Sequence, residues 1–290
     1  MTVFVILHYL AYDMTFECVS TLLHNFGDKD IQIIIVDNAS SNGSGAKLKD
    51  AFEVQKTVHV ILNDENLGFA KGNNIGYEFG RQFNPDFIVV MNNDVLIDDV
   101  DFLSKIETIY NDDGFAVLGP DIFNPKTGKH QNPLYLKGNS RENVIKMRNN
   151  LEKGLNNFSL FYYKTKLLTP VKRLIKKILF PQKSRRSNID WTQSYENPVL
   201  QGACYIFSKE FISIRDYAFY PETFLYFEED ILHLQCQQQG LKMLYWPEIR
   251  VNHLEDVSTN MILKTDLEKE KMKSQNLIQS MNEFIKLYTS

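Results

Sequence analysis

Asn92, Asn93 and Asp94 are residues of the types that bind a hard cation or a phosphate, and they follow directly on an apolar run. That run, Phe87–Met91, is short and rich in β-branched side chains, which is typical of a strand buried on both faces. In an open α/β sheet, ligands bind just beyond the carboxyl ends of the strands. The stretch therefore predicts a site where a carboxylate holds a divalent cation against a phosphate. A simple turn is the alternative interpretation of these three residues alone.

Two further apolar runs end in polar, turn-forming residues. Ile31–Val36 is followed by Asp37 and Asn38, and Val58–Leu62 is followed by a polar stretch at residues 63–74. Because the carboxyl ends of parallel strands meet at one edge of a sheet, we expect these loops to lie beside the first site.

Apolar runs and helical periods alternate four times in the first 115 residues, which predicts an α/β fold with a parallel sheet and right-handed crossovers. Asp13 or Thr15 is a candidate N-cap for the first helix. The expected strands are Val3–Leu7, Ile31–Val36, Val58–Leu62, Phe87–Met91 and Ala116–Leu118. The expected helices are one that buries Cys18, Leu22, Leu23 and Phe26, one from Asn74 to about Phe83, and one over Asp98–Asn111.

The second half of the chain carries an acidic triplet, Glu228–Asp230, at the predicted start of a helix that ends at Gln239. Gly240 follows as a candidate C-cap. A buried strand with a small-residue break at Gly202 is expected over Val199–Phe207. The other expected elements are strands at Lys242–Tyr245 and at Ile249–Val251, with His253 just beyond, and a final helix over Leu263–Tyr288.

Residues 124–188 show no regular pattern, and the charge changes sign within them. Residues 164–186 hold nine basic side chains and no acidic one, with apolar residues at near-helical spacing. This pattern predicts a basic amphipathic helix, which suits an anionic membrane surface. A solvated basic face docked on the domain is the alternative interpretation.

Composition narrows the class of protein. The 290-residue chain has a formal net charge of −4, which argues against general nucleic-acid binding. Cys18, Cys204 and Cys236 show no metal-ligand spacing and leave one cysteine unpaired in any disulfide scheme, which favours a reducing compartment such as the cytoplasm. The first residues lack the features of a signal peptide, and no apolar run is long enough to cross a bilayer.

Six short motifs come in the order and spacing found in family 2 glycosyltransferases, which this chain resembles. It is similar to the GT-A-fold members that build bacterial surface polysaccharides, notably the rhamnosyltransferase-like group. The resemblance covers about residues 2–125 and 196–259. The motifs are Val36–Ser40, Asn66–Asn73, Asn92–Asp94, Gln201–Gly202, Glu228–Asp230 and His253.

The resemblance implies a nucleotide-sugar donor, a saccharide or polyprenyl-linked acceptor, and Mg²⁺ or Mn²⁺. The cation offsets the negative charge that develops on the leaving diphosphate. Its implied ligands are Asp94, the one charged residue of its motif, and His253. The glycines let the backbone approach the ligand, and the helix after residues 66–73 is expected to present unpaired N–H groups. The implied donor-binding residues are Leu7, Tyr9, Asp37, Asn38, Asn66, Gly68, Phe69, Gly72, Asn73, Asn92, Asn93, Gln201 and Gly202.

The acceptor hydroxyl must lose its proton to a carboxylate, and the resemblance assigns that base to the Glu228–Asp230 triplet. Family members carry an arginine six residues after the base and a glycine eleven residues after it. Counting back from Gly240 without a gap gives Glu229, and the arginine position is then Gln235. We therefore expect Glu229 to be the base, with Asp230 as the second candidate.

Two other functions fit parts of the pattern. Sugar nucleotidyltransferases share the alternating fold, but they usually carry a glycine-rich basic loop after the first strand, and residues 7–12 contain no glycine, arginine or lysine. A non-catalytic carbohydrate-binding relative is the third interpretation, although both carboxylate sites are present. The expected organisation is a GT-A domain over residues 1–260, with an insertion at 124–195, and a C-terminal helix over 261–290 that is a candidate homo-oligomer contact.

Overall fold

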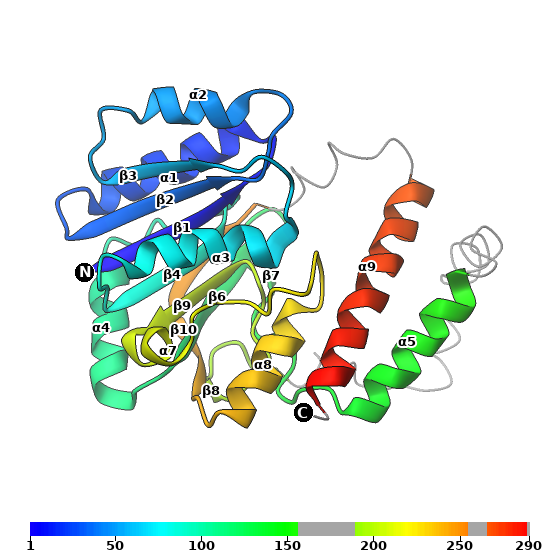
Figure 1. Cartoon of the computed structure of the whole chain (residues 1–290). Coiled ribbons are helices and arrows are strands. Elements are labelled where there is room, and N and C mark those ends of the chain that lie inside the picture. Colours follow the sequence, from blue (N-terminus) through cyan, green and yellow to red (C-terminus); the bar gives the residue numbers. More distant parts are fainter. Residues whose placement is uncertain (156–188, 255–265, 289–290) are drawn as a thin grey trace.

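The computed structural model describes residues 1–155, 189–254 and 266–288. In these ranges ten strands form one mixed sheet in the order β3-β2-β1-β4-β9-β6-β10-β5, with β7 paired to β6 and β8 to β10 (Figure 1). The strands are β1 Thr2–His8, β2 Ile31–Asp37, β3 Val58–Leu62, β4 Phe87–Asn92, β5 Val95–Leu96, β6 Val117–Asn124, β7 Lys129–His130, β8 Tyr195–Glu196, β9 Cys204–Ser208 and β10 Met243–His253. The helices are α1 Tyr12–Phe26, α2 Ser44–Ala51, α3 Gly68–Arg81, α4 Phe102–Asp113, α5 Arg141–Leu155, α7 Lys209–Ile214, α8 Glu228–Gln238 and α9 Asp266–Leu287.

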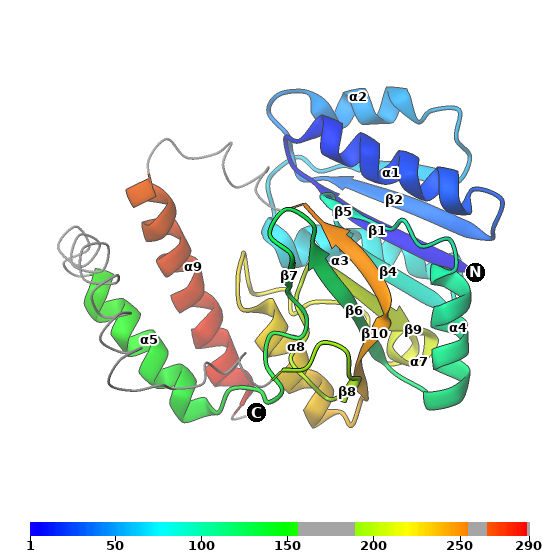
Figure 2. The same cartoon turned by 180° about the vertical axis from the view of Figure 1, so that it is seen from behind.

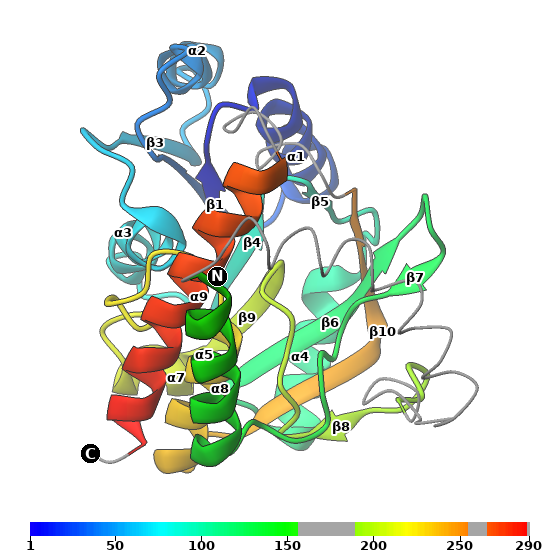
Figure 3. The ribbon, with the colours of Figure 1, turned by 90° about the vertical axis from the view of Figure 1, so that its right-hand side faces the viewer.

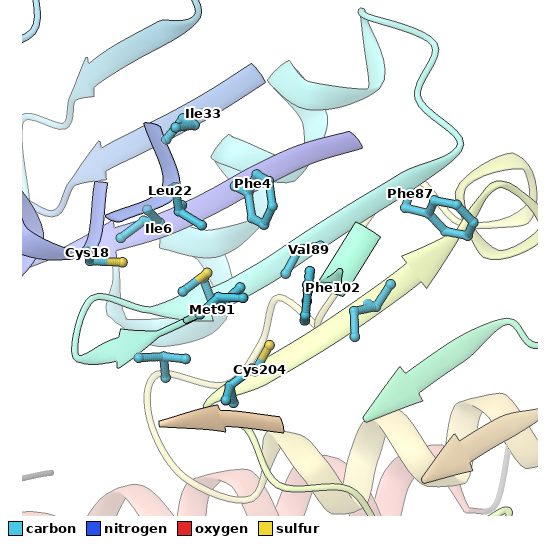
Figure 4. Close-up of a cluster of buried hydrophobic side chains, with 14 of the residues drawn as sticks. Phe4, Ile6, Cys18, Leu22, Ile33, Phe87, Val89, Met91, Phe102 and Cys204 are labelled. Carbon is cyan, nitrogen blue, oxygen red and sulfur yellow. The ribbon is translucent and has the colours of Figure 1, made fainter. Parts of the chain in front are cut away.

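Helices cover both faces of the sheet. One apolar cluster joins α1, α2 and α4 to the sheet, and α1 and α4 lie toward the viewer in Figure 2. Figure 4 shows part of that cluster, in which Cys18 and Leu22 of α1 meet Ile6 and Met91 of the strands. A second cluster joins α3, α7 and α8 to the opposite face. The strands between these layers are buried on both faces, as their apolar sequences require.

The last helix, α9, belongs to a third apolar cluster outside these layers. It packs against α5 and meets the start of α8 through Phe227, Met281 and Phe284 (Figure 3). The second half of the chain therefore surrounds α8 from two sides, the sheet and α9.

Four glycines spaced four residues apart, from Gly68 to Gly80, line one side of α3. A Cβ added at Gly76 would lie 2.4 Å from Val5 Cγ1 and 3.0 Å from Val36 Cγ2. The absence of side chains along this line therefore lets α3 lie directly on β1 and β2.

The parallel half of the sheet is as predicted. The strand Val58–Leu62 is observed with the predicted bounds, and Val3–Leu7, Ile31–Val36 and Phe87–Met91 each lie inside an observed strand. β3, β2, β1 and β4 are parallel to one another, whereas β9 runs antiparallel between β4 and β6. The predicted α/β class is confirmed.

The predicted caps of α1 were wrong. Its N-cap is Ala11, and no side chain caps it, because the helix begins before Asp13 and Thr15. Thr15 Oγ1 instead donates a hydrogen bond to the Ala11 carbonyl, at 3.2 Å.

Helices α2, α3, α5 and α7 depart from the predictions. The predicted loop at residues 63–74 ends early, because α3 starts at Gly68. Helix α2 was not predicted and buries only Ser44, Gly45 and Leu48, and α5 was not predicted either. Polar helices such as these give no hydrophobic signal in the sequence.

Two strand predictions in the second half were also wrong. The strand expected over Val199–Phe207 is β9, which starts only at Cys204, after the turn at Gly202. The two short strands expected between Lys242 and Val251 form the single strand β10. Its pairing with β6 shifts register between Trp246 and Arg250, because the proline within this interval has no N–H to donate.

The basic helix predicted over residues 164–186 lies outside the described residues and stays a prediction, as do the predicted domain bounds. Within the described ranges, no helix is both long enough and apolar enough to span a bilayer.

We expect Gly76→Ala to lower the free energy of unfolding by about 1–3 kcal/mol, because the new methyl group overpacks β1. The clash should outweigh the gain in helix propensity of about 1 kcal/mol. Chemical denaturation monitored by circular dichroism would measure this, with Glu78→Ala on the exposed side of α3 as the control. Equal stability of the two variants would contradict the close approach.

Candidate functional site

The predicted site residues gather at one edge of the sheet, at the carboxyl ends of β2, β1 and β4. Leu7 lies opposite Asn92 across β1 and β4, and His8 lies opposite Asp37 across β1 and β2. The Asn92 N–H donates to the carbonyl of Ala203 at the start of β9, at 2.9 Å. β9 is antiparallel to β4, so the Gln201–Gly202 turn that precedes it reaches the same edge.

Asp94 and His253 lie together because β5 and β10 pair antiparallel, with Val95 opposite His253. Asp94 Oδ1 is 3.3 Å from His253 Nε2. His253 Nδ1 lies 2.7 Å from Gln131 Oε1. Since that amide oxygen only accepts, Nδ1 carries a ring proton, and Nε2 is the nitrogen that faces Asp94. A histidine that binds a metal through Nε2 needs this tautomer.

This pair fits a divalent cation that shares its coordination with a substrate. Among the described residues, no third histidine, cysteine, aspartate or glutamate joins Asp94 and His253 to complete a site made of protein alone. Mg²⁺ usually binds proteins through one or two carboxylates together with substrate phosphates. Asp94 and His253 would therefore hold such a cation from one side and leave other positions to phosphate oxygens.

Asp37 and Asn38, at the end of β2, have different roles. Both carboxylate oxygens of Asp37 lie within 3.3 Å of the Ser40 backbone nitrogen. The carboxylate also packs against Gly45, where an added Cβ would lie 2.3 Å from Asp37 Oδ2. Asn38 is fully engaged: its Nδ2 donates to Asn66 Oδ1 and the Gly68 carbonyl, and its Oδ1 accepts from the Leu67 N–H. Asn38 therefore ties β2 to the start of α3.

Three N–H groups at the start of α3, where free N–H groups were expected, are already hydrogen-bonded to protein. The Leu67 N–H is bonded to Asn38, the Gly68 N–H to Asn66 Oδ1, and the Phe69 N–H to the Phe224 carbonyl at 2.7 Å. Gly68, at a φ of +79°, approaches Phe224 so closely that a Cβ would lie 2.3 Å from its carbonyl oxygen. These three N–H groups are therefore not free to bind a phosphate.

The other residues predicted to bind the donor line the same region. Gly72 lies against Leu7, where a Cβ would be 2.6 Å from Leu7 Cδ1. Asn73 is buried, and within the described residues its Oδ1 has no hydrogen-bond partner. The Phe69 ring packs against Phe219, and the Tyr9 carbonyl accepts from the Ala11 N–H.

Helix α8 begins with the acidic triplet, and its three carboxylates differ. Asp230 is buried, and its Oδ1 accepts from Asn139 Nδ2 at 2.7 Å. Glu228 is buried as well, and burial, followed by the charge of Glu229, raises its pKa to about 8. The partly exposed Glu229 lies against Gly202, where a Cβ would be 2.9 Å from its Oε1.

Desolvation raises the pKa of Glu229 to about 7, and the charge of Asp230 adds to the rise. Backbone hydrogen bonds at Glu229 and Gly202 act in the opposite direction. A carboxylate that titrates near neutrality and is partly exposed can accept a proton from a substrate. Of the two candidate bases, Glu229 therefore has the better geometry.

A turn of unusual conformation sets where α8 begins. Tyr226 and Phe227 both have a positive φ, 73° and 74°, which costs on the order of 1–3 kcal/mol for each residue that is not glycine. Helix α9 contacts both rings: Lys273 Nζ lies 5.4 Å from the Tyr226 ring centre, and Phe284 meets Phe227 edge-on at 5.6 Å. Helix α9 therefore stabilises the turn that positions Glu229.

Sequence reasoning missed several residues that act at this edge. Gln131 orients His253, Asn139 binds Asp230, and Phe284 supports the turn before α8. Thr15 and His8 form hydrogen bonds beneath the strand ends. His8 could have been recognised from the sequence, because it is a polar residue at the end of a buried strand. The other residues are recognised only from their contacts in the folded structure.

The fold is of the GT-A type, and comparison with known proteins identifies the family. The profile of the family described as Glycosyl transferase family 2 matches residues 3–178, more than half of the chain. The chain belongs to this family and is a glycosyltransferase.

A curated relative, dTDP-rhamnosyl transferase RfbF of Shigella flexneri, is 22% identical over 125 residues. The match covers 43% of this chain and 40% of the relative, well under half of its length.

Solved structures of glycosyltransferases share the fold. Mannosyltransferase PcManGT from Pyrobaculum calidifontis, in complex with GDP-Man and Mn²⁺, aligns with a TM-score of 0.57 at 11% identity, over 98% of this chain and 64% of that one. S. aureus TarS 1-349 in complex with UDP-GlcNAc aligns with a TM-score of 0.55 at 10% identity, over 96% and 65%. At these identities the likeness concerns the GT-A fold.

We expect Phe284→Ala to lower the free energy of unfolding by about 3–5 kcal/mol, as for other buried phenylalanines, and to speed hydrogen exchange across residues 224–230. The control is Tyr288→Ala, which removes an exposed ring that touches Phe284. Hydrogen-exchange mass spectrometry would measure the exchange rate at the turn. Unchanged exchange there would contradict its support by α9.

Proposed function

We propose that this glycosyltransferase is inverting and metal-dependent, and that it moves a sugar from a UDP- or dTDP-linked donor to a saccharide or polyprenyl-linked acceptor in bacterial surface polysaccharide synthesis. The observation that supports this most is the pairing of two carboxylate sites at one sheet edge, Asp94 with His253 and Glu229 beside Gly202. The name of the curated relative, a dTDP-rhamnosyl transferase, supports the donor class.

In the proposed reaction, Glu229 accepts the proton of the acceptor hydroxyl as its oxygen attacks the anomeric carbon of the donor. The bond from that carbon to the diphosphate oxygen breaks, and the nucleoside diphosphate leaves with the electron pair. Asp94 and His253 would hold Mg²⁺ or Mn²⁺, which, when bound, neutralises charge on the leaving group. Attack from the face opposite the leaving group inverts the anomeric carbon.

For the donor, we propose that Asp37 accepts a hydrogen bond from an N–H of the pyrimidine base. The one donor recorded for its carboxylate in the described chain is the Ser40 N–H, so lone pairs remain for a ligand. A thermal-shift screen of nucleotide-sugars tests the donor, because a bound donor stabilises the folded protein by mass action. If no UDP- or dTDP-sugar raised the melting temperature with Mn²⁺ present, the proposed donor class would be wrong.

The proposals for the acceptor and for the cellular location are based on the sequence and on the family. We propose that the basic segment 164–186 attracts an anionic membrane surface, where a polyprenyl-linked acceptor would lie.

Asp94→Asn should lower transfer on the order of 100-fold or more and weaken Mn²⁺ binding, because it removes the charged ligand and keeps the shape of the side chain. His253→Ala should weaken Mn²⁺ binding less severely. Titration calorimetry of Mn²⁺ with UDP present, together with a transfer assay, would measure both effects. Asp98→Asn, nearby and bonded to Asn252, is the control. Wild-type transfer that survived complete chelation would rule out the metal role.

Glu229→Gln should keep donor binding and lower kcat by about 10²–10⁴-fold, because proton removal is affected and ground-state binding is not. In the wild-type enzyme, kcat should rise with pH through about 7, as the protonated carboxyl loses its proton. Asp230→Asn is the matched comparison, since Asp230 is bonded to Asn139. A nearly wild-type Glu229→Gln variant beside an inactive Asp230→Asn variant would assign the base to Asp230.

A further inference from the structure

A buried network of polar side chains lies under the strand ends, between the loop that carries Asp37 and the loop that carries Asp94. His8, the last residue of β1, is completely buried at its centre. Its Nδ1 lies 2.7 Å from Thr15 Oγ1, and its Nε2 lies 2.7 Å from Ser44 Oγ. The two ring nitrogens thus face α1 on one side and α2 on the other.

The Thr15 end of this network leads to the proposed metal loop. Asn93 Nδ2 donates to Thr15 Oγ1 at 2.9 Å, and Asn93 is the residue before Asp94. All three side chains of this path, His8, Thr15 and Asn93, are buried, so water does not compete for their hydrogen bonds.

The Ser44 end leads to the proposed nucleotide loop. Ser44 is the first residue of α2, and the Asp37 carboxylate lies against the next residue, Gly45. A Cβ at Gly45 would lie 2.3 Å from Asp37 Oδ2, so the start of α2 determines where this carboxylate can lie.

One assignment of protons satisfies all of these contacts. In it, the hydroxyl proton of Thr15 goes to the Ala11 carbonyl, and Thr15 Oγ1 accepts from both Asn93 Nδ2 and His8 Nδ1–H. His8 Nε2 then accepts from the Ser44 hydroxyl. In this tautomer Nε2 has no proton to give to Asp37 Oδ1, 3.8 Å away. Burial keeps the ring neutral, because it lowers the pKa of His8 to about 4.

We propose that His8 is a positioning residue that holds the Asp37 loop and the Asp94 loop in register, so that one nucleotide-sugar can contact both. This inference rests on the proposed function of those two loops. The place is physically suited to it, because β1 lies between β2 and β4, where the strand order reverses and ligands bind in such sheets. In the network of His8, Thr15, Asn93 and Ser44, the two loops are connected only through His8 and Thr15 and not by a direct hydrogen bond.

Two substitutions separate the two halves of the network. An asparagine side chain can occupy the place of Nδ1, so His8→Asn keeps a partner for Thr15 and loses the bond to Ser44. A glutamine side chain can reach the place of Nε2, so His8→Gln keeps Ser44 and loses Thr15. Each variant loses one hydrogen bond from the same buried position, so a general loss of stability would affect both variants alike.

We expect His8→Asn to raise the KM for the donor on the order of 10-fold at saturating Mn²⁺, with less than a twofold change in the Mn²⁺ concentration for half-maximal activity. His8→Gln should show the reverse pattern. Ser44→Ala should behave like His8→Asn, and Thr15→Val should behave like His8→Gln. These two variants provide the same test if a histidine variant fails to fold. Thr21→Val on α1 is the control, since that hydroxyl bonds only to the Glu17 carbonyl in the described contacts. The same shift in both histidine variants, or no shift in either, would overturn the proposal.

A measurement independent of transfer separates this inference from the proposed function. Nitrogen-15 NMR of the wild-type protein should show His8 as the neutral Nδ1–H tautomer from pH 6 to 8. Calorimetry with UDP or dTDP and with Mn²⁺ should show the same opposite pattern in the two variants. If the wild-type protein binds both probes but transfers no sugar, the proposed function fails while the positioning role stands. An Nε2–H tautomer would overturn the network as described.

Discussion

The crossover that carries the chain from β3 back to β4 is the constraint on which the site depends. β1 has β2 on one side and β4 on the other, and its residue Leu7 lies opposite both Val36 and Asn92. At such a reversal of strand order, the loops leave in opposite directions and a crevice opens between them. Asp37 ends β2 and Asp94 follows β4, the two strands that flank β1, so the sheet fixes the distance between the proposed nucleotide and metal contacts. The glycine line of α3 contributes by letting that helix lie directly on the same strands.

Burial, rather than the helix dipole, sets the acidity of the first turn of α8. A helix N-terminus favours negative charge by about 0.3–1 kcal/mol. For Glu229, the rise of the pKa from 4.5 to about 7 corresponds to roughly 3 kcal/mol against the charged form. Because the folded pKa is the higher one, the unfolded chain releases this proton first, and stability falls as pH rises from about 4.5 to 7. A base that works near neutrality therefore costs the fold some stability, which the packing of α9 on the neighbouring turn helps to offset.

The sequence predicted those parts of the fold that rest on a repeated apolar pattern. The four parallel strands β1 to β4 were predicted because their apolar runs are continuous and the loops that follow them are polar. Helix α2 could not be found in this way, since only three of its residues are buried. For the site, the family resemblance paired Glu229 with Gly240, and in the structure Glu229 lies against Gly202. The sequence does not show which N–H groups are already hydrogen-bonded, because their partners can lie far away along the chain. The hydrogen bonds of the Gly68 and Phe69 N–H groups could therefore not be predicted.

If Glu229 is the base, the family resemblance implies an arginine at the position of Gln235, and a cation reaches that place from another element. Arg215, at the end of α7, reaches the same place from another element: its Nη2 donates to Gln235 Oε1 at 2.7 Å and its Nη1 to Gln239 Oε1 at 3.0 Å. The guanidinium also lies over the rings of Phe211 and Tyr217. Since Arg215 is 4% exposed, these contacts are needed to offset the loss of its hydration. A buried cation therefore lies beside α8, and a motif search confined to α8 would miss it.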